Sequence, residues 1–295
     1  MTGRAIELLA AYWTLAGDVY PGGPTEVSPF PLERRAAAAA EAGWTGMGFV
    51  HADLIATVER IGYGGIRRAI AESGIRHVEV EFLSDWDADP GSPARAASDR
   101  MRRELIEAAG ELGARNLKAS PHLFAPPPPD VARMRDAFSR LCEDVRPAGA
   151  NVIIEIMPFT DVRTIEDGLA IVGDAPNGGL LLDIWHVARG GIPLADVAAI
   201  PPGRLLGVEL DDAGAPMGDP FDDTRFRRVL PGQGTFDLAG FLRAAGSAGL
   251  ATPYFGVEII GEAYRRQPLE VMARTSFVAT LRAAQAAVAA MEAAR

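Results

Sequence analysis

Four acidic residues interrupt or end apolar segments of the chain. They are Glu155 in Val-Ile-Ile-Glu-Ile, Asp183 in Leu-Leu-Leu-Asp-Ile-Trp-His, Glu209 in Gly-Val-Glu-Leu-Asp-Asp and Glu258 in Phe-Gly-Val-Glu-Ile-Ile. A buried carboxylate without a partner costs several kcal/mol, so acids in buried strands need compensation. A divalent cation provides it: oxygen ligands suit Mg²⁺ or Mn²⁺, and Mn²⁺ or Co²⁺ also accepts an imidazole. For each acid alone, an ion pair with a neighbouring Arg or Lys is the alternative.

Other residues near these acids are candidates for binding a substrate. His186 follows Asp183 by three residues, and we expect both side chains at the same end of a strand. Arg228 precedes the turn Pro-Gly-Gln-Gly. A guanidinium fixed in this way can bind an anionic or polyhydroxylated ligand through two hydrogen bonds. The remaining candidates each lie near or after the end of a predicted strand: His51, Glu81 and His122.

The elements that must position these residues alternate along the chain. Short apolar runs rich in Val, Ile, Leu and Phe are typical of strands buried on both faces. Eight such strands, each followed by a helix, predict a single (β/α)₈ TIM barrel of the α/β class. An open doubly wound sheet is the alternative, but it needs a Gly-rich turn after the first strand, which is lacking here. The predicted strands are Ile6–Trp13, Gly46–Val50, His77–Leu83, Asn116–Ser120, Val152–Met157, Leu180–Trp185, Leu205–Leu210 and Tyr254–Ile260.

The segments between the predicted strands have apolar residues at helical spacing. Glycines just beyond several of these segments are typical of left-handed helix caps. Two connections, 17–31 and 211–235, are long and follow strand ends, which indicates binding loops or lids. The predicted helices are Leu32–Ala42, Gly64–Ser73, Ser92–Leu112, Asp130–Arg146, Thr164–Val172, Leu194–Ala199, Phe236–Ala248 and Pro268–Ala294.

Composition excludes several classes of function. The 295 residues carry a net charge of -10, which argues against a nucleic-acid-binding protein with its basic surface. No apolar run approaches the roughly 20 residues that span a membrane. The start Met1–Arg4 lacks the pattern of a secretory signal, so we expect a cytoplasmic protein. No internal repeat or linker is visible, so we expect one domain over residues 1–295. The single cysteine, Cys142, is expected to be a core residue.

The quoted motifs resemble the xylose isomerase-like TIM barrel superfamily, also called sugar phosphate isomerases/epimerases. The superfamily includes ketose 3-epimerases, inosose dehydratase, 3-dehydroshikimate dehydratase and endonuclease IV. The resemblance covers nearly the whole chain and implies that Glu155, Asp183 and Glu258 bind one divalent metal ion, Mn²⁺, Mg²⁺ or Co²⁺. It also implies that His186 contacts metal or substrate and that Arg228 contacts substrate.

One position departs from the family pattern. The ligand on the seventh strand is commonly His, or Gln in some dehydratase-like members, whereas this chain has Glu209. Glu209 is either a fourth ligand or a substrate base, and as a ligand it would give a divalent ion four carboxylates. The four histidines of the chain are too few for the three-zinc site of the endonuclease branch.

The resemblance implies an isomerase or epimerase acting on a sugar, keto-sugar or cyclitol. Glu155 and Glu258 would exchange the proton α to a carbonyl through a metal-stabilised enediolate, with His186 and Arg228 holding the substrate oxygens. A lyase is the first alternative: a keto-cyclitol or dehydroshikimate-type dehydratase, or an enzyme that opens 3-keto-glycosides. It would use a general acid such as His51, Glu81 or His122. A non-catalytic sugar-binding or partner subunit is the second. The Ala-rich final helix is a candidate interface of a homo-oligomer.

Overall fold

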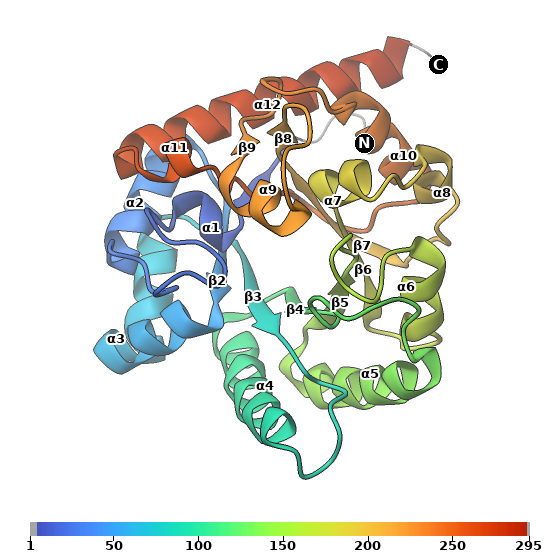
Figure 1. The fold of residues 1–295 in the computed structure, drawn as a ribbon. Helices are drawn as coiled ribbons and strands as arrows, with labels where there is room; N and C mark the ends of the chain where they lie inside the picture. Colours follow the sequence, from blue (N-terminus) through green and yellow to red (C-terminus); the bar gives the residue numbers. More distant parts are fainter. Residues whose placement is uncertain (1–4, 294–295) are drawn as a thin grey trace.

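Eight parallel strands close into a barrel in the computed structural model, which describes residues 5–293 (Figure 1). The closed order β1-β10-β7-β6-β5-β4-β3-β2 confirms the predicted (β/α)₈ barrel and excludes the open sheet. The barrel strands are β1 (Leu8–Ala10), β2 (Gly46–Val50), β3 (His77–Leu83), β4 (Asn116–Ala119), β5 (Asn151–Glu155), β6 (Gly178–Asp183), β7 (Leu205–Leu210) and β10 (Phe255–Val257).

Helices surround the strands, and the last one, α12, packs along α10 and α2 (Figure 1). Their apolar faces, together with the strands, form one large buried core. Cys142 belongs to this core, as predicted. The helices are α1 (Tyr12–Leu15), α2 (Leu32–Ala42), α3 (His51–Glu72), α4 (Pro93–Leu112), α5 (Val131–Val145), α6 (Ile165–Val172), α7 (Ile184–Arg189), α8 (Leu194–Ala198), α9 (Pro220–Phe226), α10 (Leu238–Ser247), α11 (Glu262–Arg265) and α12 (Leu269–Ala293).

Three of the elements that differ from the sequence prediction begin at or just after the end of a strand. The first strand ends at Ala10, and the chain turns at once into α1 instead of extending to Trp13. Helix α3 begins at His51, well before the predicted start at Gly64, and a non-helical Gly62 divides it. The predicted sixth strand ends at Asp183, and His186 lies in the short helix α7 that follows it directly. Short buried helices and strands have similar apolar patterns, so periodicity alone does not separate them.

The strand register brings the acidic positions to one end of the barrel. Asp183 on β6 pairs with Glu209 on β7, and Glu209 pairs with Gly256 on β10. Glu155 ends β5, and Glu258 directly follows β10. In such barrels the carboxyl ends of the strands and the loops that follow them form the active-site face. The fold therefore places all four acids where catalytic residues lie in this architecture.

The long connection after β7 is structured. It contains a two-stranded antiparallel sheet, β8 (Asp212–Ala213) with β9 (Arg228–Val229), and helix α9 lies between these strands. No helix within residues 5–293 is long and apolar enough to cross a membrane. The Met1–Arg4 segment used for the prediction of a cytoplasmic protein, and the predicted helix end Ala294, lie outside the described residues.

Candidate active site

The four predicted acids converge inside the mouth of the barrel. Each of Glu155, Asp183, Glu209 and Glu258 offers a carboxylate oxygen, and these four atoms lie within 4.8 Å of one another. All four side chains are buried, with at most 7% of each residue exposed. Glu155, Asp183 and His186 form a second such group with the same spacing. The geometry thus gathers the acids into one cluster.

A buried lysine on β4 compensates part of this negative charge. The Nζ atom of Lys118 lies 2.5 Å from Glu209 Oε1, 2.7 Å from Glu81 Oε2 and 3.7 Å from Glu79 Oε2. Although burial alone would lower it, contact with Glu209, Glu81 and Glu79 raises the pKa of Lys118 well above its usual value. Burial raises the pKa of Glu209, a rise that the Lys118 ammonium opposes. Lys118 therefore carries its positive charge within the barrel.

Arg228 supplies the second positive charge. Its NH1 nitrogen lies 2.5 Å from Asp183 Oδ2, 2.6 Å from Asp211 Oδ2 and 3.2 Å from Glu258 Oε2. Its NH2 nitrogen donates a hydrogen bond to Thr224 Oγ1 at 2.8 Å. The guanidinium is buried and holds two of the four clustered acids, so it orients the cluster and also lines the cavity.

The turn after Arg228 is fixed by Asp212. This carboxylate accepts hydrogen bonds from the backbone N–H groups of Gly232, Gly234 and Phe236. A Cβ atom on Gly234 would lie 2.2 Å from Asp212 Oδ1, so only glycine allows this close approach. Together with the β8–β9 pairing, these bonds hold the segment that carries Arg228 against the barrel mouth.

Two glutamates of the cluster differ in their surroundings. Burial raises the pKa of Glu258 to about 8, against the lowering effect of Arg228. Burial also acts on Glu155, but contact with the His186 ring, whose Nε2 lies 3.3 Å from Glu155 Oε1, brings the pKa of Glu155 below its usual value. Before any cation binds, Glu258 therefore favours the neutral form and Glu155 the ionised form.

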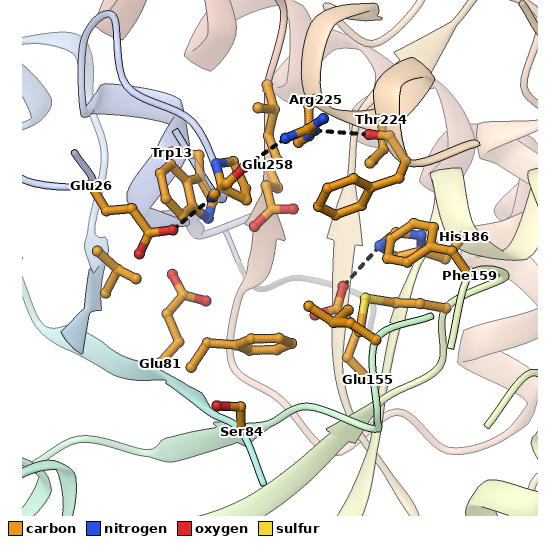
Figure 2. Close-up of a pocket in the computed structure, with 18 of the residues that line it drawn as sticks. Trp13, Glu26, Glu81, Ser84, Glu155, Phe159, His186, Thr224, Arg225 and Glu258 are labelled. Carbon is orange, nitrogen blue, oxygen red and sulfur yellow. Dashed lines mark hydrogen bonds and ion pairs between the residues drawn. The ribbon is translucent and has the colours of Figure 1, made fainter. Parts of the chain in front are cut away.

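A cavity of about 540 Å³ opens above the acids. Glu155, His186, Arg228 and Glu258 line it, whereas Lys118 does not. Figure 2 shows Glu155 and His186 on one side of this cavity and Glu81 on the other. Its size falls within the usual range of small-molecule sites, about 300–1,000 Å³.

The other predicted substrate contacts divide into two groups. His51 and Glu81 line the cavity, with His51 Nε2 2.6 Å from Glu104 Oε2. His122 is not among the lining residues. Its ring nitrogens lie 2.6 Å from Asp87 and 2.8 Å from Asp161. These two carboxylates raise the pKa of His122 to about 10 and occupy both nitrogens, so we exclude His122 from the proposed site.

The residues present fit a divalent cation. The Oε2 atom of Glu209 is buried and has no hydrogen-bond partner among the described residues, although the Oε1 atom is bound by Lys118. Carboxylates from four strands with such an uncommitted oxygen form the oxygen-rich donor set that Mg²⁺ and Mn²⁺ prefer. Glu155, Asp183, Glu209 and Glu258 would hold the ion.

Lys118 and Asp211 belong to the site but were not among the residues predicted from the sequence. Around the four carboxylates expected to face a divalent ion, the structure places two side-chain cations, because Lys118 and Arg228 contact three of the four acids. The signal was present: Lys118 interrupts the buried strand Asn-Leu-Lys-Ala just as the acids interrupt theirs. Asp211 directly follows β7, where an acid could be recognised but its partner could not.

Comparison with known proteins yields related sequences and folds. The family model for the xylose isomerase-like TIM barrel matches residues 36–278. A 3-dehydroshikimate dehydratase of Pseudomonas aeruginosa is 26% identical over 245 residues, covering 80% of this chain but only 37% of that protein. The chain thus spans little more than a third of this curated relative.

Solved structures share the fold at lower identity. The IOLI protein with a bound zinc atom superposes with a TM-score of 0.81 and 17% identity, covering 94% of this chain and 98% of that one. An L-ribulose 3-epimerase gives a TM-score of 0.73 and 17% identity, covering 98% of each chain. The family model spans most of the described barrel, and the chain belongs to the xylose isomerase-like TIM barrel family.

Proposed function

We propose that the protein is a divalent-metal-dependent isomerase or epimerase of a sugar, keto-sugar or cyclitol. The observation that carries this proposal is the pair Glu155 and Glu258, which reach one cavity from β5 and from the end of β10. An epimerase needs two groups that can exchange a proton with one carbon atom from different sides. The L-ribulose 3-epimerase and the zinc-bound protein of the same fold are consistent with this chemistry.

The residues of this chain would divide the reaction among themselves. One of Glu155 and Glu258 removes the proton α to the substrate carbonyl, and the other returns a proton to the opposite face. His186 and Arg228 hold substrate oxygens, and both already contact members of the acidic cluster. A divalent ion held by the acidic cluster, Mn²⁺, Mg²⁺ or Co²⁺, would supply Lewis acidity toward a substrate carbonyl oxygen.

A lyase is the second candidate. The 3-dehydroshikimate dehydratase of Pseudomonas aeruginosa, which matches 80% of this chain, favours it. A dehydratase begins with the same proton removal and then protonates a leaving hydroxyl group. Glu81 and His51 line the cavity and are the candidates for that general acid.

Proton exchange in D₂O tests the proposal. With Mn²⁺ present, we expect deuterium to enter the α position of at least one compound in a panel of keto-sugars and keto-cyclitols. Glu155→Gln and Glu258→Gln should each slow this exchange by at least about 100-fold. Glu26→Gln is the matched control, since Glu26 lines the cavity outside the acidic cluster and its carboxylate accepts a hydrogen bond from the Gly22 N–H.

The product distinguishes the two reactions. An epimer of unchanged composition, labelled with one deuterium, supports the isomerase or epimerase, whereas loss of water or of a glycosidic group supports the lyase. Exchange that persists in EDTA and in both glutamine variants would contradict the proposal.

A further inference from the structure

The walls of the cavity differ in chemistry from its floor. The ionisable groups of the proposed site lie at the floor, in the barrel mouth. Apart from these groups the lining is mostly apolar: Trp13, Val50, Phe82, Met101, Met157 and Ile260, with Leu123, Phe124, Phe159 and Phe221; its further polar side chains are Glu26, Ser84, Thr224 and Arg225. A free polyol would meet few partners for its hydroxyl groups along these walls, and unpaired buried hydroxyl groups are costly.

A row of aromatic rings runs from the protein surface to the catalytic floor. Phe124 packs edge to face on Phe221 at 4.8 Å, Phe221 packs on Phe159 at 5.3 Å, and Phe159 packs on His186 at 5.5 Å. These residues come from the connections after β4, β5 and β7 and from α7. We name Phe124, Phe159 and Phe221 the aromatic wall; Figure 2 shows Phe159 beside His186.

The outer end of the aromatic wall is exposed. Phe124 is 64% exposed and its neighbour Leu123 is 41% exposed, two of the five exposed large apolar residues found within the described chain. Their position is fixed, because Phe124 N–H donates to Phe159 O at 2.8 Å and Leu123 pairs with Thr160. Adjacent exposed apolar side chains at the entrance of a pocket indicate a binding surface.

Two charged side chains that line the cavity, Arg225 and Glu26, already have protein partners. The Arg225 guanidinium lies 4.0 Å from the centre of the Phe221 ring and donates to Pro21 O and Asp222 Oδ1. The Glu26 carboxylate accepts from Gly22 N–H. The rim therefore offers a ligand mainly aromatic and aliphatic surface.

We propose that the substrate is a keto-sugar or keto-cyclitol that bears an aromatic substituent, and that the aromatic wall binds this substituent. The inference deepens the proposed function and rests on it for the position of the oxygenated ring. The wall ends at His186, so a ring held at the floor would direct its substituent along Phe159 and Phe221 toward Phe124. The cavity, about 540 Å³, has room for a second ring.

A matched pair of probes tests the inference: methyl and phenyl 3-keto-β-D-glucopyranoside, which differ only in the substituent. Calorimetric binding and α-proton exchange are measured with Mn²⁺. We expect about tenfold tighter binding and higher kcat/KM for the phenyl compound. Phe124→Ser and Phe221→Leu should each reduce this advantage to about twofold or less. Val278→Ser, at another exposed apolar residue on α12, should leave it unchanged.

The outcomes separate this inference from the proposed function. If both probes bind and exchange equally well, and Phe124→Ser changes neither, the aromatic-substituent inference is overturned. The α-proton exchange itself would still support the proposed function. Phenyl-selective binding without exchange would support the aromatic wall and count against the proposed chemistry. Failure of both probes to bind would overturn the inference, as would a change of oligomeric mass in Phe124→Ser, which would make the wall a subunit contact.

Discussion

Replacing Lys118 with methionine would remove the only ammonium found within hydrogen-bonding distance of Glu209 and Glu81 in residues 5–293. Methionine preserves most of the side-chain volume, so the change acts mainly on charge. Removing one partner of a buried ion pair typically costs about 3–5 kcal/mol, because the other charge stays buried without compensation. We expect Lys118→Met to lower the free energy of unfolding by that amount when a chelator is present.

A double-mutant cycle isolates the Lys118–Glu209 contact. Glu209→Gln removes the opposite charge, so Lys118→Met/Glu209→Gln should cost about 2–3 kcal/mol less than the sum of the single variants. Arg34→Met is the exposed control, since the Arg34–Glu270 pair is about half exposed and such pairs contribute about 0–1 kcal/mol. Urea unfolding in EDTA measures the wild type and all four variants.

The cation adds a second readout. A bound divalent ion would take over the neutralisation of the carboxylates, so Mn²⁺ should stabilise Lys118→Met more than the wild type. A loss of less than about 1 kcal/mol in the unfolding free energy of Lys118→Met would contradict a buried ion pair. Additive effects of Lys118→Met and Glu209→Gln would contradict it as well.

Four further predictions follow from the cluster and its surroundings. Asp183→Asn should weaken Mn²⁺ binding by at least about 100-fold in chelator competition, which is more than the loss typical of residues that only hydrogen-bond to a metal ligand. Unchanged Mn²⁺ affinity would show that Asp183 is not a ligand. Arg228→Lys should lower Mn²⁺ affinity about 10- to 100-fold, because an ammonium cannot contact Asp183, Asp211 and Thr224 together. Arg225→Lys is the control, and equal Mn²⁺ affinity of the two variants would contradict the orienting role of Arg228. Glu209→His should keep the metal, shift its preference toward Zn²⁺ or Co²⁺ and retain proton exchange; retained metal with exchange reduced by orders of magnitude would make Glu209 the base. His122→Gln should destabilise the protein by about 2 kcal/mol at pH 6, a value reduced for partial exposure. Because the folded-state pKa of His122 is raised to about 10, its stabilisation is complete below its unfolded value and is lost as pH rises toward 10; a pH-independent difference in unfolding free energy would be contrary evidence.

The barrel could be predicted because its signals are local. Strands such as Gly46–Val50 and Leu205–Leu210 have the predicted bounds in the structure, since a run buried on both faces is predominantly apolar. The short helices α1 and α7 and the hairpin β8–β9 could not be predicted. They depend on contacts between distant segments, such as Arg228 with Asp183, which periodicity does not record.

The convergence of the acids could also be predicted, because the carboxyl ends of all the strands of a closed parallel barrel open at the same end. Their partners could not. Lys118 reaches Glu209 across the barrel interior from a strand that is not adjacent to β7, and only closure of the barrel brings the two together. The assignment of His122 to substrate failed to anticipate Asp87 and Asp161, which come from two other connections and enclose its ring.

We expect one divalent cation to bind among Glu155, Asp183, Glu209 and Glu258. Anomalous diffraction at the manganese edge, from crystals grown with Mn²⁺, would locate this ion. We expect a single anomalous peak in the barrel mouth, about 2.0–2.4 Å from a carboxylate oxygen of each of the four residues. No peak at this place, or a peak elsewhere while Arg228 and Lys118 alone neutralise the acids, would show that the cluster is not a metal site.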